Sequence, residues 1–143
     1  MTAVMQGVRI LEVAEHTFVP AASALLADWG AEVVKVEHVE RGDAMRGLAS
    51  SGLAIMGTSV HVLLEHSNRG KKSLGLDLTS KNGLDIIYKL VATCDVFLTN
   101  DPYSCNGAIS HINDWLMLMP VYKDGRVIAW AAMFGHMTDV GGK

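Results

Sequence analysis

Long apolar runs, a cysteine motif and an excess of charge are all missing from this sequence. Its two cysteines, Cys94 and Cys105, have no CxxC spacing, which favours reduced thiols in a cytoplasmic protein. No apolar run reaches the ~18 residues that cross a bilayer, so we expect no membrane association. The net charge of -3 gives no general case for a nucleic-acid partner.

The composition indicates one folded domain over residues 1–143. Half of the residues are hydrophobic and 19% are charged, so disorder is disfavoured and a somewhat apolar surface is expected. An exposed apolar face or strand edge tends to pair with a second copy. We therefore expect a homodimer.

A β-α-β unit opens the chain. The runs Gly7 to Ala14 and Ala31 to Val36 are rich in β-branched residues and predict parallel strands, with a helix over Pro20 to Trp29 between them. Gly30 is placed just past the predicted helix end, where glycine is favoured. The unit belongs to an α/β sheet.

The first turn of this unit, residues 15–20, contains no glycine. A pyrophosphate therefore cannot approach the backbone as it does at a GxGxxG turn, which disfavours a dinucleotide oxidoreductase. Glu37 ends the second predicted strand, where an acidic side chain can hold a ribose hydroxyl or can simply be solvated.

A basic loop, Asn68 to Ser73, follows the weakly patterned residues 38–67, where Ser59 to Glu65 can form a short helix or strand. Arg69 can bind two phosphate oxygens at once, and Lys71 and Lys72 add point charges. The loop is a candidate phosphate site, and the alternative is an ordinary solvated basic loop.

Further alternating elements predict about four strands in a parallel layer. Leu74 to Leu78 and Asp95 to Leu98 are strand-like, and Thr79 or Ser80 can cap a helix over residues 82–92. We therefore predict a Rossmann-like α/β fold with flanking helices.

Residues 7–100 resemble the amino-terminal segment of the class III CoA-transferases, the family of formyl-CoA and carnitine-CoA transferases and 2-methylacyl-CoA racemase. The motifs that carry the resemblance are LLADWGAEVVKVE and NRGKKSLGLDL. The resemblance implies that CoA or an acyl-CoA binds here, with its adenine near Val36, Glu37 and His38. It places the phosphates near Arg41 and near four residues of the basic loop: Asn68, Arg69, Lys71 and Lys72.

The family's catalytic aspartate, and the His and Asp pair of its racemases, lie downstream of the resembling segment. No residue here is therefore assigned a catalytic role. We expect a CoA-binding domain that is catalytically incomplete.

Residues 101–143 predict a different local structure, an antiparallel hairpin that finishes the sheet. Trp115 to Tyr122 and Arg126 to Phe134 are strand-like, and Asp124-Gly125 between them is a strong hairpin signal. Pro120 predicts an edge strand or a bulge in the first of these strands.

His111, Asp114 and His136 flank this hairpin and are suitable ligands for a divalent metal, although three polar residues beside a hairpin need have no such role. With the motifs NDPY, HxxD, PVYKDGR and GH, residues 96–143 are similar to a segment of the hydantoinase B and acetone carboxylase α-subunit family. That resemblance implies a fusion near residue 100 and a metal held by these three residues. The alternatives to a CoA-binding domain are thus a metal-binding fragment and an α/β domain without retained activity.

Overall fold

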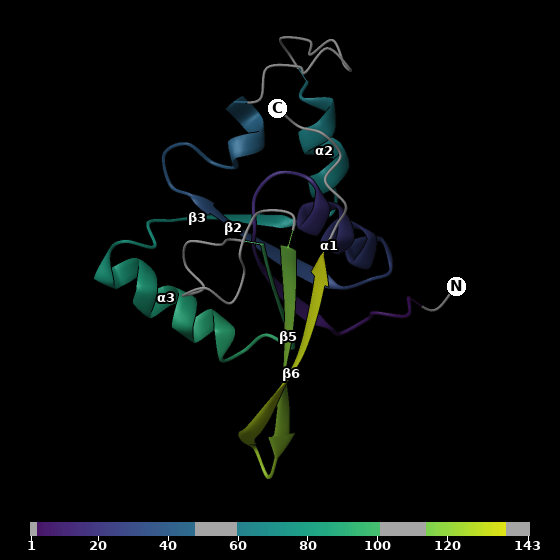
Figure 1. Cartoon of the computed structure of the whole chain (residues 1–143), viewed down its shortest axis with the longest axis vertical. Helices are drawn as coiled ribbons and strands as arrows, with labels where there is room; N and C mark the ends of the chain where they lie inside the picture. Colours follow the sequence, from purple (N-terminus) through teal and green to yellow (C-terminus); the bar gives the residue numbers. More distant parts are fainter. Residues whose placement is uncertain (1–2, 48–59, 101–113, 137–143) are drawn as a thin grey trace.

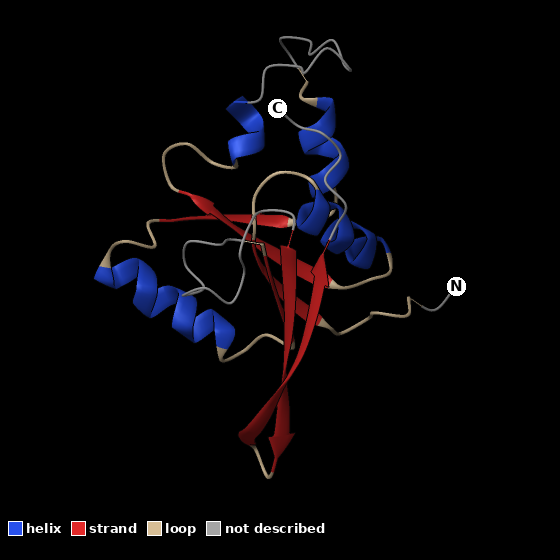
Figure 2. Cartoon of the chain, in the orientation of Figure 1, coloured by secondary structure: helices blue, strands red, loops and turns tan. Residues whose placement is uncertain are grey.

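A computed structural model of the protein describes residues 3–47, 60–100 and 114–136. These residues form a six-stranded mixed sheet in the order β3-β2-β1-β4-β5-β6, with helices packed on it (Figures 1 and 2). The strands are β1 (Arg9–Val13), β2 (Glu32–His38), β3 (Lys72–Leu76), β4 (Val96–Thr99), β5 (Asp114–Lys123) and β6 (Arg126–His136). The helices are α1 (Phe18–Asp28), the 3₁₀ helix η1 (Ala44–Gly47), α2 (Val62–Asn68) and α3 (Lys81–Val91).

The first four strands are parallel, as the sequence predicted. β1 pairs with β2 and with β4, and β2 also pairs with β3. The two predicted strands of the β-α-β unit therefore lie next to each other in one sheet. The α/β fold class is confirmed.

Alternating side chains of β1 divide the core between the two faces of the sheet. Ile10 belongs to a buried cluster that includes Val19 of α1, whereas its neighbour Leu11 belongs to a second cluster that includes Ile87 of α3. Because successive residues of a strand point to opposite faces, α1 and α3 cover opposite faces of the sheet (Figure 1).

The helix ends follow the expected local chemistry. Gly30 comes two residues after α1 ends and has a φ of 101°, a left-handed conformation that glycine adopts without strain. The Ser80 hydroxyl caps α3 by accepting a hydrogen bond from the Gly83 N–H at 3.0 Å. Of the predicted segment Ser59 to Glu65, the residues from Val62 onward are helical as the start of α2, and Ser59 lies outside the described residues.

The predicted hairpin is present. Asp124 and Gly125 have φ values of 52° and 74°, and Lys123 pairs with Arg126, which describes a two-residue turn of the primed type. The last pair between β4 and β5 joins Phe97 to Leu118, so Pro120 lies where β5 has only β6 beside it. The hairpin thus extends past the end of β4 and projects from the sheet (Figure 1).

The described helices give no sign of a membrane span. None of them is both long enough and apolar enough to cross a bilayer.

Candidate functional site

A buried cluster of charged side chains lies between the sheet and α1. Glu12 of β1 and Lys35 of β2 are register partners, and the Lys35 ammonium lies 2.8 Å from a Glu12 carboxylate oxygen and 2.7 Å from the Asp43 carboxylate. The side chains of all three residues are at most 2% exposed. Burial opposes the charge on Lys35, but Glu12 and Asp43 outweigh it and hold the pKa of Lys35 above its usual value.

Lys71 of the basic loop completes this cluster, beside the first turn of α1. Its ammonium lies 2.7 Å from Glu12, and it also donates to the Pro20 carbonyl at 2.7 Å and to Asn68 at 3.3 Å. Burial lowers the pKa of Lys71 to about 8, although Glu12 acts in the opposite direction. The ionic cluster, defined here as Glu12, Lys35, Asp43 and Lys71, therefore contains two carboxylates and two amines in a nearly dry environment.

Asp43 ties the loop after β2 to the first turn of the fold. Its carboxylate accepts hydrogen bonds from the backbone N–H of His16 at 2.9 Å and of Met45 at 2.8 Å. Burial alone would raise the pKa of Asp43, but Lys35 and these N–H groups outweigh it, and the pKa lies below its usual value of 3.8. His16 has a φ of 71°, so this turn is held in a conformation that a histidine rarely adopts.

Glu37 ends up in contact with several donors at the carboxyl end of β2. Its carboxylate accepts from the Arg46 guanidinium at 3.2 Å, from the Asp43 N–H at 3.2 Å and from the Ser73 hydroxyl. Burial opposes the charge, but Ser73 and Arg46 outweigh it and hold the pKa of Glu37 below its usual value. The Glu37 carboxylate is therefore engaged within the fold, and its predicted role toward a ribose stays a prediction.

The other residues predicted for the adenosine end have different surroundings. The Val36 side chain is 5% exposed and packs in the core with Leu11 and Leu76, so it does not face a ligand site. Nδ1 of His38 accepts from the Glu40 N–H at 3.2 Å, in the exposed turn that also contains Arg41.

The three cations of the basic loop have three different carboxylate partners. Arg69 pairs with Asp28 at 2.6 Å and Lys72 with Glu32 at 2.5 Å, and both pairs are on the surface. Lys71 instead points inward to Glu12. The loop is therefore neither wholly solvated nor a single open phosphate cradle.

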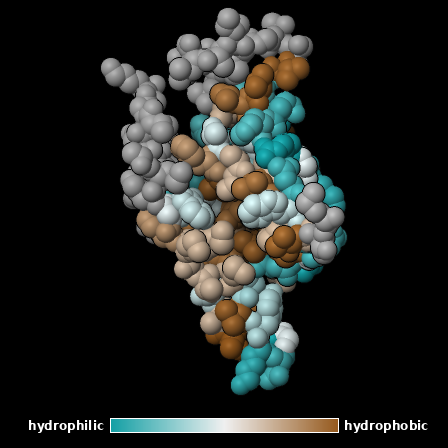
Figure 3. All heavy atoms as spheres, turned by 90° about the vertical axis from the view of Figure 1, so that its right-hand side faces the viewer, coloured by the Kyte–Doolittle hydropathy of each residue, from teal (hydrophilic) through white to brown (hydrophobic). Residues whose placement is uncertain are grey.

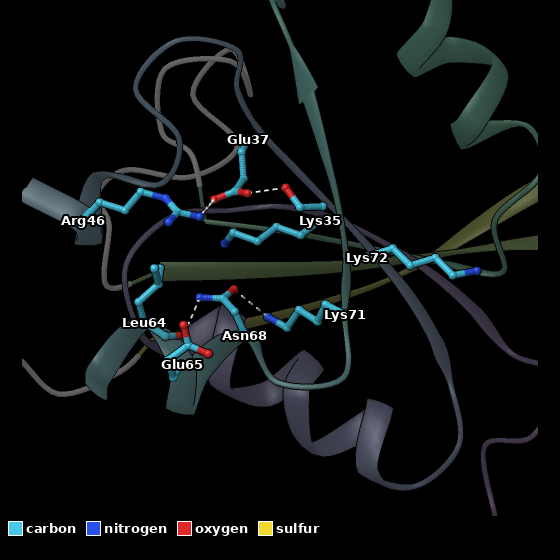
Figure 4. A pocket seen from close by; sticks show the side chains of 9 residues that line it. Lys35, Glu37, Arg46, Leu64, Glu65, Asn68, Lys71 and Lys72 are labelled. Atoms are coloured by element: carbon cyan, nitrogen blue, oxygen red, sulfur yellow. Dashed lines mark hydrogen bonds and ion pairs between the residues drawn. The ribbon is translucent and has the colours of Figure 1, made fainter. Parts of the chain in front are cut away.

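A cavity of about 190 Å³ lies beside the ionic cluster (Figure 4). Strand β2, the start of β3, α2 and η1 all contribute to its lining, which consists of Lys35, Glu37, Arg46, Leu64, Glu65, Asn68, Lys71, Lys72 and Ser73. Four of the eight residues predicted to bind CoA are in this set, namely Glu37, Asn68, Lys71 and Lys72. The structure thus brings together residues from two sequence segments that the resemblance had paired.

Several residues of this site were not predicted from the sequence. Glu12 and Lys35 each sit inside an apolar strand run, and Arg46 lies in the weakly patterned stretch before α2. Both Glu12 and Lys35 occupy core-facing positions of predicted neighbouring strands. Because charged residues are seldom buried without a partner, this pattern could have indicated a buried ion pair.

Two of the three predicted metal ligands lie within the described residues. His111 lies outside the described residues, while Asp114 is buried and is the register partner of His136. Within the described ranges no group of three or more His, Cys, Asp or Glu side chains could hold a metal ion. The metal site stays a prediction.

Comparison with known proteins assigns most of the described sheet to one family. Residues 5–104 match CoA-transferase family III. The chain is 32% identical over 96 residues to (R)-2-hydroxy-4-methylpentanoate CoA-transferase of Clostridioides difficile, an alignment that covers 67% of this chain and 24% of that protein. It is 38% identical over 96 residues to human succinyl-CoA:glutarate CoA-transferase, with 67% and 21% of the two chains covered. The chain thus spans about a quarter of the length of these relatives.

Solved structures agree with this assignment. A CAIB/BAIF family protein from Brucella suis superposes with a TM-score of 0.62 at 28% identity, over 72% of this chain and 27% of that one. A hypothetical protein from Mycobacterium tuberculosis superposes with a TM-score of 0.56 at 32% identity, over 65% and 24% of the two chains. Sequence and fold therefore lead to the same conclusion: the chain belongs to CoA-transferase family III.

Proposed function

We propose that this chain is a CoA-binding domain, and that the phosphate-bearing end of CoA or an acyl-CoA binds at the cavity beside the ionic cluster. The observation that carries the proposal is the convergence of Glu37, Asn68, Lys71 and Lys72 on that one cavity. These residues come from separate segments that the family resemblance independently assigns to CoA.

The lining contains four cations, Lys35, Arg46, Lys71 and Lys72, and two carboxylates, Glu37 and Glu65. Lys35 and Lys71 already share the buried carboxylates of Glu12 and Asp43, and Lys72 pairs with Glu32. An anion is therefore expected to bind through the exposed cations, which can exchange a carboxylate partner for a phosphate. Arg46 is half exposed and its guanidinium can bind two phosphate oxygens at once.

The surface ion pairs of the basic loop can rearrange toward a phosphate. Exposed pairs of this kind contribute about 0–1 kcal/mol, so little is lost when Arg69 or Lys72 leaves its carboxylate partner. Lys71 is different, because it is buried against Glu12 and contributes mainly its charge. Binding is therefore expected to depend most on Arg46, Arg69 and Lys72.

The size of the cavity limits what it holds. Pockets for drug-sized ligands begin at about 300 Å³, so a cavity of about 190 Å³ takes one end of CoA and leaves the rest on the surface. The relatives are named as CoA-transferases. The segment that this chain shares with them is proposed to contribute CoA recognition to such a reaction.

Calorimetry of this chain with CoA tests the proposal. We expect Arg46→Ala combined with Lys72→Ala to weaken CoA binding at least tenfold, with a smaller loss for dephospho-CoA if the 3′-phosphate is the group held. Lys89→Ala is the matched control, because Lys89 is an exposed lysine of α3 outside the cavity lining. No heat of CoA binding at millimolar ligand, or equal affinity in the double variant and the control, would overturn the assignment.

A further inference from the structure

The two edges of the sheet are protected very differently. The edge strand β3 has five residues and begins with Lys72, a cation that discourages pairing with another chain. The opposite edge strand, β6, has eleven residues, and none from Val127 to Gly135 is charged. Among the described residues β6 pairs only with β5, so its outer backbone N–H and C=O groups have no strand partner there, and a bulge at Ile128 interrupts this edge only near the turn.

The hairpin also exposes a large apolar surface (Figure 3). Its large apolar side chains are between 41% and 60% exposed: Met119, Val121, Tyr122, Val127, Ile128, Trp130, Met133 and Phe134. An exposed apolar patch of roughly 300–600 Å² is the largest on a typical monomer and often marks an interaction site, and eight half-exposed side chains on one hairpin reach this range. Pairing at the β6 edge covers the part of this surface that borders β6, and the backbone hydrogen bonds of the strand supply the rest of the interface.

We infer that β6 pairs with β6 of a second copy of this chain, antiparallel about a two-fold axis, so that the two sheets become continuous. With a two-fold axis perpendicular to the sheet, residues that oppose each other in the two copies of β6 have their side chains on the same face of the joined sheet. The register between β5 and β6 shifts between Val121 and Tyr122, which leaves Ile128 as a bulge, so the regular part of β6 begins at Ala129. Centring the axis at Ala131, the middle residue of β6, opposes residues 129–133 of the two copies.

Side-chain sizes match in this register. Trp130 of one copy faces Ala132 of the other, and Met133 faces Ala129. A large side chain opposite a small one packs closely across adjacent strands, whereas a register shifted by one pair places Trp130 opposite its own copy. The single charged residue of β6, Arg126, lies at the end of the pairing rather than inside it.

Sedimentation velocity on the full chain tests the inference. We expect a dimer at micromolar concentration, and we expect both Ala131→Lys and Ala131→Glu to raise its dissociation constant at least tenfold, since like charges then face each other. Ala131 is exposed, so both variants should keep the circular dichroism spectrum of the parent. An equimolar mixture of the two variants should recover the dimer, because opposite charges then meet at the axis.

A cross-linking experiment tests the register itself. Opposed residues of antiparallel strands have Cα atoms about 4.5–5.5 Å apart, within the range of a disulfide. Ala131→Cys should therefore cross-link two copies under mild oxidation, whereas Val127→Cys should not, because its two thiols would be roughly 25 Å apart. A monomeric parent, a dimer that neither charge variant weakens, growth beyond dimers, or equal cross-linking in the two cysteine variants would each overturn the inference. A dimer insensitive to these changes would assign the hairpin to another partner.

Discussion

Glu12 and Lys35 face each other across β1 and β2, with 2.8 Å between carboxylate and ammonium and almost no exposure of either side chain. Both belong to the face that α1 covers, since Glu12 alternates with Leu11 and bonds to Ser23 of α1. The core under α1 is therefore apolar at one end, around Ile10, and ionic at the other, where the chain leaves β1 for its first turn. This is the end at which the cavity and the predicted CoA site lie.

Removing one charge from this pair should destabilise the fold strongly. Glu12→Gln leaves Lys35 and Lys71 buried with only the Asp43 carboxylate between them. We expect a loss of about 3–5 kcal/mol in the free energy of unfolding, measured by urea denaturation. The control is Glu32→Gln, which removes the surface partner of Lys72 and should change stability far less. Equal losses of unfolding free energy in the two variants would show that the buried ion pair stabilises the fold no more than the surface pair does.

Lys71 should titrate well below the other lysines. Its pKa of about 8 compares with its usual 10.5, so between these values the unfolded chain binds more protons than the folded one. The contribution of Lys71 to the free energy of unfolding therefore rises as pH increases from about 8 to 10.5. Carbon-13 NMR of the lysine Cε groups should show one early transition that disappears in Lys71→Met. A Lys71 midpoint above pH 10 would show that the attraction of Glu12 outweighs burial at Lys71, as it does at Lys35.

Acid should also destabilise the fold, through Asp43 of the ionic cluster and through Glu37 beside it. Asp43 and Glu37 have pKa values below the usual 3.8 and 4.5, so each adds stability above its unfolded pKa and loses it as pH falls through its folded pKa. Asp43→Asn should lower stability at pH 7 and flatten the decrease below about pH 4. Urea midpoints across pH 2–7 measure both effects, and an unchanged acid slope in the variant would exclude Asp43 as a source of the decrease.

Local patterns predicted the secondary structure well because they depend on nearby residues. The β-branched runs gave the parallel strands, Ser80 gave a cap, and Asp124-Gly125 gave the hairpin turn. Each of these signals works within a few residues, where backbone sterics and local hydrogen bonds decide the conformation.

The candidate site was less predictable because its partners are far apart in sequence. The basic loop was identified as a possible anion site, but its sequence contains no sign that Lys71 turns inward while Arg69 and Lys72 remain on the surface. That division depends on Glu12, 59 residues earlier, and on the position of α1. Glu37 was singled out from its place near a strand end and does line the cavity, whereas its partner Arg46 depends on how the loop after β2 folds back.

His16 offers a test of stored backbone strain. Its φ of 71° lies in the left-handed region, which costs most residues about 1–2 kcal/mol and glycine nothing. The bond to Asp43 uses the backbone N–H and survives substitution. His16→Gly should therefore raise stability by up to about 1 kcal/mol after the entropy of glycine in the unfolded chain is subtracted. Thermal unfolding measures the change, and a lower melting temperature would mean that the imidazole contributes more than the backbone strain removes.

Replacing Gly83 with alanine should destabilise the protein, which is the opposite of the usual effect of this substitution in a helix. Glycine to alanine in a helix interior normally stabilises by about 1 kcal/mol. Here a Cβ atom on Gly83 would lie 1.9 Å from the Asp77 carbonyl oxygen, which also accepts the Ser80 hydroxyl at 2.8 Å. Gly83→Ala must therefore move the turn before α3 and disturb the Ser80 cap.

We expect Gly83→Ala to lower the free energy of unfolding by about 1–3 kcal/mol, as overpacking and loss of a cap do elsewhere. Asn82→Ala is the matched control, because Asn82 is the exposed neighbour in the same turn and gains a few tenths of a kcal/mol from helix propensity alone. Urea denaturation of both variants measures whether each substitution lowers or raises the free energy of unfolding. A gain in Gly83→Ala equal to that in Asn82→Ala would show that the turn at Asp77 adjusts without loss, and that the cap, rather than close packing, determines where α3 begins.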